Sequence, residues 1–309
     1  MQKRRFPVLD IFIIFIICVF IISILNGEKG NILAFYSDFS IHGISKVNKT
    51  KSHTNRIGVK DIIKEKKKKD KKVLRNFKWL DPGRIKREVV FFISEKTIKE
   101  EIKSFGINPL ISHPLYRKNK GFKVIGRRNF FINKKIVEKT YFIIDYKQIY
   151  ERNLKYFFDL TEALSVSADI LKGTDPMPKF LAFVQHIKFK KPPDYYKGKF
   201  INNFFTPLLC IYEQYGDCDS KSILLAEFLG SIQDSKEKVA IVLVRGNGIS
   251  HALLAVKRKP LPGMTSLFDC KKGYFIIIET SAPGWAPGFI NKRITDALKS
   301  GFFRMVELN

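Results

Sequence analysis

The sequence predicts an α+β fold, and three observations carry that prediction. An apolar run of helical character, residues 223–229, follows directly on the stretch around Cys218. Three strand-like runs then follow, at residues 239–244, 251–256 and 274–280. A hydrophobic fraction of 45% in 309 residues is enough to build a core, with room for one or two domains.

The chain is strongly basic. Its net charge is +27, from 56 Lys and Arg against 29 Asp and Glu. The excess of basic residues and the 28 phenylalanines are spread along the chain, and no nucleic-acid-binding motif is present. We therefore expect no nucleic-acid partner, and expect an anionic envelope polymer or lipid surface as the electrostatic partner.

Residues 1–26 are predicted to be a short cytoplasmic stub and a transmembrane anchor. Basic residues at 3–5 precede an apolar run at 11–25, interrupted only by Cys18 and Ser23. A signal peptide has the same pattern, but residues 23–27 contain no clear small-x-small cleavage site. A buried helix of a soluble domain is disfavoured because the run has no polar face. The expected topology is single-pass, with the amino end cytoplasmic and the main domain periplasmic or extracellular.

Residues 27–72 are predicted to be a basic, flexible tether. They are polar and end in the lysine-rich stretch 64–72. Such a charge run is typically solvated, and it also suits anionic lipid headgroups.

Residues 73–174 are predicted to form a small α+β region. Ser94 is a helix-capping residue, and Gly106 marks the end of the helix that follows it. The other elements expected in this region are strands at 88–93, 121–127 and 139–145 and a helix at 148–171.

Residues 175–309 are predicted to be the main domain, which carries Cys218. Arg245 to Gly248 form a tight-turn signal, so strands 239–244 and 251–256 are expected to pair antiparallel. The further elements expected here are helices at 179–187, 208–215 and 295–298, an extended stretch at 188–190, a basic loop at 257–272 and a strand at 302–308.

Cys218 is a candidate nucleophile. Gly216 makes a turn, and Asp217 and Asp219 stand where acidic residues favour a helix start. Unpaired N–H groups and the helix dipole at such a place lower the pKa of a thiol, and the thiolate is the reactive form. The alternative is a small buried cysteine at a helix start.

His251 and Glu279 supply the other two groups that a thiol nucleophile needs. His251 begins a strand-like run 33 residues after Cys218, and Glu279 ends another such run 28 residues later. A base must take the thiol proton, and a third group must fix the tautomer of that base. Alternatively, His251 is a hydrogen-bonded edge residue and Glu279 is solvated.

Four stretches resemble the transglutaminase-like superfamily, in its bacterial and archaeal extracytoplasmic branch. They are YGDCDSKSILLAEFL at 215–229, SHALLAV at 250–256, FIIIETSAPGW at 275–285 and FLAFVQHIKFKKPPDYY at 180–196. The resemblance covers residues 178–289.

The resemblance implies a papain-like α+β core with Cys218 as nucleophile, His251 as base and Glu279 as the orienting acid. The third position departs from the family, because many members have Asp followed by Pro or Thr where this chain has Glu279 and Thr280. Such folds host peptidases, amidases, cross-linking transamidases and inactive relatives.

Three further residues are candidates for the site. Gln185 and Gln214 carry amides that, with the backbone N–H of Cys218, could serve as oxyanion donors. The alternative for each is a surface glutamine. Trp285 lies between two Pro-Gly turns and is a candidate wall of a substrate cleft, or a lid over the core.

The cysteines also allow two rival interpretations. In an oxidising compartment Cys218 could form a disulfide with Cys210 or Cys270. A zinc site with His251 has suitable ligand types, but the spacings match no common zinc pattern. We therefore expect neither metal nor cofactor.

The functional expectation is a membrane-anchored, extracytoplasmic enzyme that acts on a protein or peptide substrate. The reaction expected is thiol-dependent acyl transfer, or amide or peptide hydrolysis, through a thioester on Cys218. The alternative is a catalytically inactive scaffold or binding module of the cell envelope.

Overall fold

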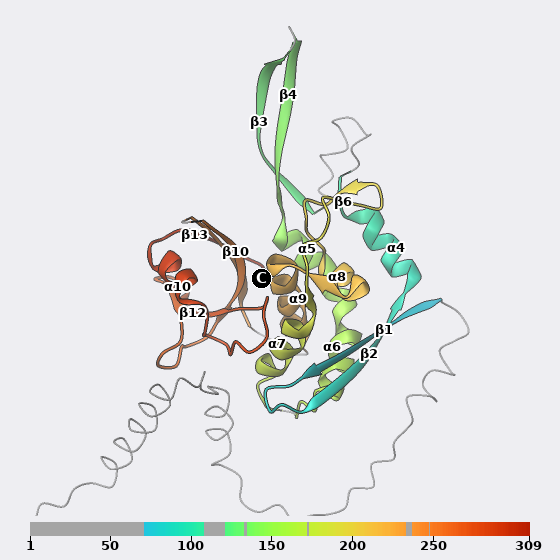
Figure 1. Cartoon of the computed structure of the whole chain (residues 1–309), viewed down its shortest axis with the longest axis vertical. Coiled ribbons are helices and arrows are strands. Elements are labelled where there is room, and N and C mark those ends of the chain that lie inside the picture. Colours follow the sequence, from blue (N-terminus) through green and yellow to red (C-terminus); the bar gives the residue numbers. More distant parts are fainter. Residues whose placement is uncertain (1–70, 108–120, 133–134, 172, 233–236, 247) are drawn as a thin grey trace, which may run out of the picture. The chain divides into compact units, whose positions relative to one another are not determined.

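The protein is a mixed structure of helices and antiparallel sheets (Figure 1). The computed structural model describes residues 71–107, 121–132, 135–171, 173–232, 237–246 and 248–309. The predicted anchor and nearly all of the predicted tether lie outside these residues. Within the described ranges, no helix is both long and apolar enough to cross a bilayer.

A five-stranded antiparallel sheet has the strand order β11-β12-β10-β9-β13. Its central hairpin pairs Ser250 with Arg245 and Leu254 with Ile241, as the turn signal predicts. The strands are β9 (Val239–Gly246), β10 (Ile249–Lys257), β11 (Ser266–Asp269), β12 (Gly273–Ile278) and β13 (Phe303–Glu307). Strand β11 lies inside what the sequence predicted to be a loop.

The two faces of this sheet carry alternate residues of each strand. On β9, Val239 and Ile241 belong to the core on the α9 side, whereas Ala240 and Val242 belong to the core beneath α10 (Lys292–Lys299). This follows from the two-residue period of a strand. Because both faces are covered, the buried parts of β9, β10 and β12 are apolar at consecutive positions rather than alternating.

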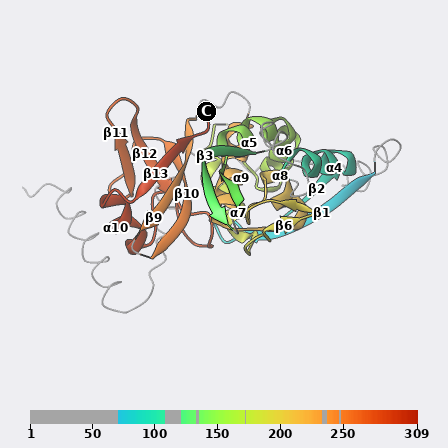
Figure 2. The same ribbon diagram turned by 90° about the horizontal axis from the view of Figure 1, so that it is seen from above.

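Helix α9 (Cys218–Gly230) lies between the sheet and the other helices (Figures 1 and 2). It packs against α5, α6, α7, α8 and β10. Every residue from 220 to 229 is buried, and residues 223–229 are apolar except for Glu227. Asp217 caps its start by accepting a hydrogen bond from the N–H of Ser220.

The hairpin of β1 (Lys72–Leu80) and β2 (Lys86–Ser94) shares the core of α9. Phe77 and Phe91 pack edge-on or tilted against each other and against Phe183 of α7 (Met177–His186). The sequence predictions did not include β1, because charged and polar residues interrupt its apolar ones.

The predicted helix at 148–171 is two helices rather than one. Asp145 caps α5 (Tyr146–Asn153) by accepting from the N–H of Gln148, so this helix begins before the predicted start. A 3-10 turn, Leu154–Tyr156, then separates it from α6 (Phe157–Ser167). The sequence could not show the break, because the apolar spacing continues through it.

The remaining elements complete the helical side. Ser94 caps α4 (Glu95–Ser104), as predicted. The hairpin of β3 (Phe122–Ile132) and β4 (Lys135–Ile144) extends away from the helices in Figure 1. The others are β5 (Lys188–Phe189), β6 (Tyr195–Tyr196), β7 (Lys199–Phe200), α8 (Pro207–Glu213) and β8 (Tyr215–Gly216), with β5 and β8 parallel.

Replacement of Phe228 tests whether α9 organises the core. Its ring contacts four aromatic rings, and the side chain is fully buried. We expect Phe228→Ala to lower the free energy of unfolding by ~3–5 kcal/mol, through lost burial and an unfilled cavity. Urea denaturation measures this. The control is Phe158→Ala on α6, where the side chain is 52% exposed and we expect a change of no more than ~0.5 kcal/mol. Equal losses in the two variants would contradict the assignment.

Candidate active site

Cys218 is the first residue of α9, as the sequence predicts. Its thiol is partly exposed and accepts hydrogen bonds from the backbone N–H groups of Ala252 and Asp219. The first of these belongs to β10, so the thiol lies against the strand that begins near His251. Gly216 is required in the approach to the helix, because a Cβ there would lie 2.8 Å from the sulfur of Cys210.

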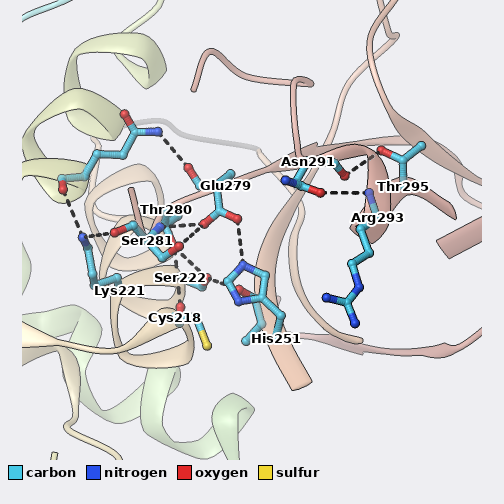
Figure 3. A network of polar contacts seen from close by, with 12 residues as sticks. Cys218, Lys221, Ser222, His251, Glu279, Thr280, Ser281, Asn291, Arg293 and Thr295 are labelled. Carbon is cyan, nitrogen blue, oxygen red and sulfur yellow. Dashed lines mark hydrogen bonds and ion pairs between the residues drawn. The ribbon is translucent and has the colours of Figure 1, made fainter. Parts of the chain in front are cut away.

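His251 and Glu279 are hydrogen-bonded to each other. The distance from Nε2 of His251 to Oε2 of Glu279 is 2.7 Å, and both side chains are largely buried. His251 is on β10, and Glu279 follows the last residue of β12. Figure 3 shows the three predicted residues together, with the sulfur of Cys218 on the side of the imidazole away from Glu279. The structure thus brings the three candidates into one site.

The carboxylate of Glu279 is held at both oxygens. Its Oε1 accepts hydrogen bonds from the N–H of Ser281 at 2.7 Å and from the hydroxyl of Ser281 at 2.5 Å. Burial alone would raise the pKa of Glu279, but the hydrogen bonds and charge of His251 and the bonds from Ser281 outweigh it and lower the pKa. Glu279 is therefore an ionised acceptor with a fixed orientation.

The expected lowering of the Cys218 pKa is wrong for this site. Burial, together with the negative charges of Asp219 and Asp217, raises the pKa of the thiol to about 12. The two backbone N–H groups act in the opposite direction but are weaker. A helix start therefore does not by itself produce a thiolate when acidic residues flank the cysteine.

An acidic pair lies beside the nucleophile. The hydroxyl of Tyr146 donates to Oδ2 of Asp219 at 2.8 Å. Burial, followed by the charge of Asp217, raises the pKa of Asp219 well above its ordinary value. Asp219 therefore gives up its proton at a higher pH than an ordinary aspartate does.

The two glutamines are not placed as oxyanion donors. The amide nitrogen of Gln185 donates at 2.8 Å to the backbone oxygens of both Glu279 and Trp285, which uses both of its hydrogens. Gln214 ends α8 in a left-handed conformation, and its amide donates to the backbone oxygen of Asn76 on β1. Gln185 instead anchors the segment that carries the acid.

A groove of about 1140 Å³ borders the site. Asp217, Asp219 and Ser250, which are sequence neighbours of the nucleophile and the histidine, line one part of it. Trp285 is partly exposed but is not among the lining residues. Cys218, His251 and Glu279 are not among the lining residues either, so the groove lies next to the site and does not contain it.

The rival interpretations of the cysteines are not supported. Cys210, Cys218 and Cys270 are all free thiols, so neither disulfide is formed. In the part of the chain that the structure describes, no three His, Cys, Asp or Glu side chains gather to hold a metal ion.

Sequence reasoning missed four residues that support the site. Ser222 and Thr280 share a hydrogen bond of 2.9 Å between their hydroxyls, in the space between α9 and the end of β12. Ser281 fixes Glu279, and Lys221 is buried beneath both. None of the four has a local signal in the sequence, because Lys221 stands among polar residues and small hydroxyl residues are common throughout the chain.

Comparisons with known proteins place no family name on this arrangement. No protein-family model matches the chain, and no curated protein matches it in sequence. The assignment of function therefore depends on the geometry of the site.

The ionised state of Glu279 can be tested through stability. Because its folded pKa is lowered, Glu279 stabilises the fold above its unfolded pKa, and this contribution is lost as the pH falls through the folded value. We expect Glu279→Gln to be less stable than wild type at neutral pH, and the difference to shrink between about pH 5 and pH 3. Urea unfolding across this range measures it. The exposed Glu162→Gln is the control, and a difference that stays constant with pH would contradict the assignment.

The effect of the acidic pair on the thiol is also measurable. We expect Asp219→Asn to lower the pKa of Cys218, because it removes a negative charge that opposes the thiolate. The pH dependence of iodoacetamide modification, read at Cys218 by peptide mass, should move to lower pH. Asp296→Asn on the exposed face of α10 is the matched control. If the pH profile of modification does not move in Asp219→Asn, burial alone keeps the thiol of Cys218 protonated.

Proposed function

We propose that this protein is a cysteine-dependent acyl-transfer enzyme built on a papain-like, transglutaminase-like core. The observation that carries the proposal is the bond between His251 and Glu279, at 2.7 Å, beside a cysteine at a helix start. An imidazole fixed at one nitrogen by a doubly held carboxylate has its other nitrogen available as a base. Three of the four stretches that resemble the superfamily contain these residues.

The proposed reaction begins with the neutral thiol. As the sulfur of Cys218 attacks a carboxamide or peptide carbonyl carbon, its proton passes to Nδ1 of His251. The tetrahedral intermediate collapses when the carbon–nitrogen bond breaks, and the leaving amine takes that proton. The thioester is then attacked by water or by a second amine, whose proton passes to His251 and then to the departing thiol. Hydrolysis and transamidation differ only in this acceptor.

A thiol with a pKa of about 12 fits concerted proton removal better than a standing thiolate. The N–H of Cys218 is at a helix start, where no intrahelical acceptor exists, and it is the oxyanion donor of this proposal. The groove beside Asp217 and Ser250 is large enough for a peptide segment.

The proposed substrate is a protein or peptide of the cell envelope, and the proposed location is the outer side of a membrane. Both follow from the apolar run at 11–25 and the net charge of +27. That run lies outside the described residues.

A second candidate function is a binding or scaffold module with the same fold. The raised pKa and the limited exposure of Cys218 favour it, because they describe an unreactive thiol in the absence of substrate. The two candidates differ in whether an acyl group is transferred to this sulfur.

Acylation of the purified protein tests the proposal. We expect p-nitrophenyl acetate to acylate Cys218 as a thioester, detected by intact mass and by release of nitrophenolate. Cys218→Ala should abolish it, and His251→Ala should lower the rate by about 10²-fold or more, because the general base is lost.

Cys270→Ala is the control, since that thiol is exposed and free. Acylation of Cys270 at a rate equal to that of Cys218 would support the scaffold instead. Added glycine methyl ester distinguishes an amine acceptor from water. Transamidation yields the acetylated amine, whereas hydrolysis yields acetate.

A further inference from the structure

Lys221 is a fully buried lysine one turn after the nucleophile on α9. Its ammonium donates to three backbone oxygens, those of Gln185 at 3.1 Å, Ile187 at 2.9 Å and Ser281 at 3.1 Å. An ammonium has three hydrogens, so each has an acceptor. Full pairing is what allows a charge to be buried without a large penalty.

These acceptors belong to the two segments that hold the acid. Gln185 and Ile187 are at the carboxyl end of α7, where the helix dipole favours a cation. Ser281 holds Glu279 through its N–H and its hydroxyl, and Gln185 donates to the backbone oxygen of Glu279. Figure 3 shows the run of contacts from Lys221 through Ser281 to Glu279. Lys221 thus fastens the nucleophile helix to the acid.

The charge of Lys221 also acts on the site. Its pKa is lowered to about 8, because burial outweighs the opposing effects of Cys210 and Glu279. The thiol of Cys210 is itself buried, with its pKa raised to about 12, so it is neutral at physiological pH. Glu279 is therefore the ionised group that acts on Lys221, and Ser281 links the two side chains. When the thiol is protonated and His251 is neutral, these two opposite charges offset each other.

We propose that Lys221 is a positioning residue and the standing counter-ion of Glu279. It keeps the carboxylate ionised and in place while His251 remains neutral, which is the state in which the imidazole accepts the thiol proton. This inference rests on the proposed acyl-transfer function.

Removal of the Lys221 ammonium changes where the site binds its proton. A buried carboxylate without its counter-ion attracts a proton, either to itself or to the imidazole bonded to it. Either outcome removes a neutral base held by an ionised acid. The acylation rate should then fall, and the acidic limb of its pH profile should move to higher pH.

The charge pairing is tested first without any reaction. Nuclear magnetic resonance of the lysine side chains follows the titration of Lys221 in wild type and in Glu279→Gln. We expect Lys221 to titrate near pH 8 in wild type, and at lower pH in the variant, because the opposite charge is gone. The side-chain signal of Lys179, which donates to the backbone oxygens of Ala168 and Asp169, is the reference and should be the same in both proteins. An unchanged titration of Lys221 would overturn the proposal.

The second test is a double-mutant cycle on the acylation rate. We expect Lys221→Met to lower kcat about tenfold or more with KM unchanged, and to have no further effect in the Glu279→Gln background. Lys179→Met is the matched control and should leave the rate unchanged. The same loss in both backgrounds would show that Lys221 does not act through Glu279.

The two tests separate the two proposals. If the wild-type protein is not acylated at all, the proposed function fails. The titration of Lys221 still shows whether Lys221 is the counter-ion of Glu279. If Lys221→Met does not fold, the comparison of the Lys221 titration in wild type and in Glu279→Gln still tests this pairing of charges.

Discussion

The burial of α9 on every side is the constraint on which the rest of this structure depends. A helix in which every residue from 220 to 229 is buried must be covered by sheet on one side and by helices on the others. The phenylalanines of β2, α6 and α7 meet on Phe228 to provide that cover. Because the helix is held this firmly, its first residue, Cys218, has a fixed position against β10.

The same burial explains why the polar groups of the site are so fully bonded. Glu279 has hydrogen-bond donors at both oxygens, Gln185 uses both amide hydrogens, and Lys221 uses all three of its own. In a poorly solvated interior each polar group without a hydrogen-bond partner would cost free energy. A buried polar network therefore stabilises the fold only when all of its groups are paired. Completeness also removes freedom of movement, and a fixed carboxylate and imidazole are what proton transfer requires.

Much of this arrangement could be predicted from the sequence, and the misses have physical causes. The helix start at Cys218, the hairpin that carries His251 and the strand that ends before Glu279 all have local signals in composition, turns and periodicity. Two kinds of feature have no such local signal. Strand β1 mixes charged and apolar residues, and it is a strand because Phe77 and Trp79 pack on the core. The pKa of Cys218 and the amide contacts of Gln185 depend on groups distant in sequence, which no local pattern reports.

The separation of the three site residues along the chain has a consequence for the order of folding. Cys218 and its helix form from local contacts, but His251 and Glu279 lie 33 and 61 residues further on, and they arrive only when β9, β10 and β12 have paired. Pairings over such distances form late, because loop closure must precede them. A partly folded chain therefore carries Cys218 as an ordinary thiol with no base beside it. In the proposed mechanism, the meeting of the thiol with its base is therefore a property of the completed tertiary structure.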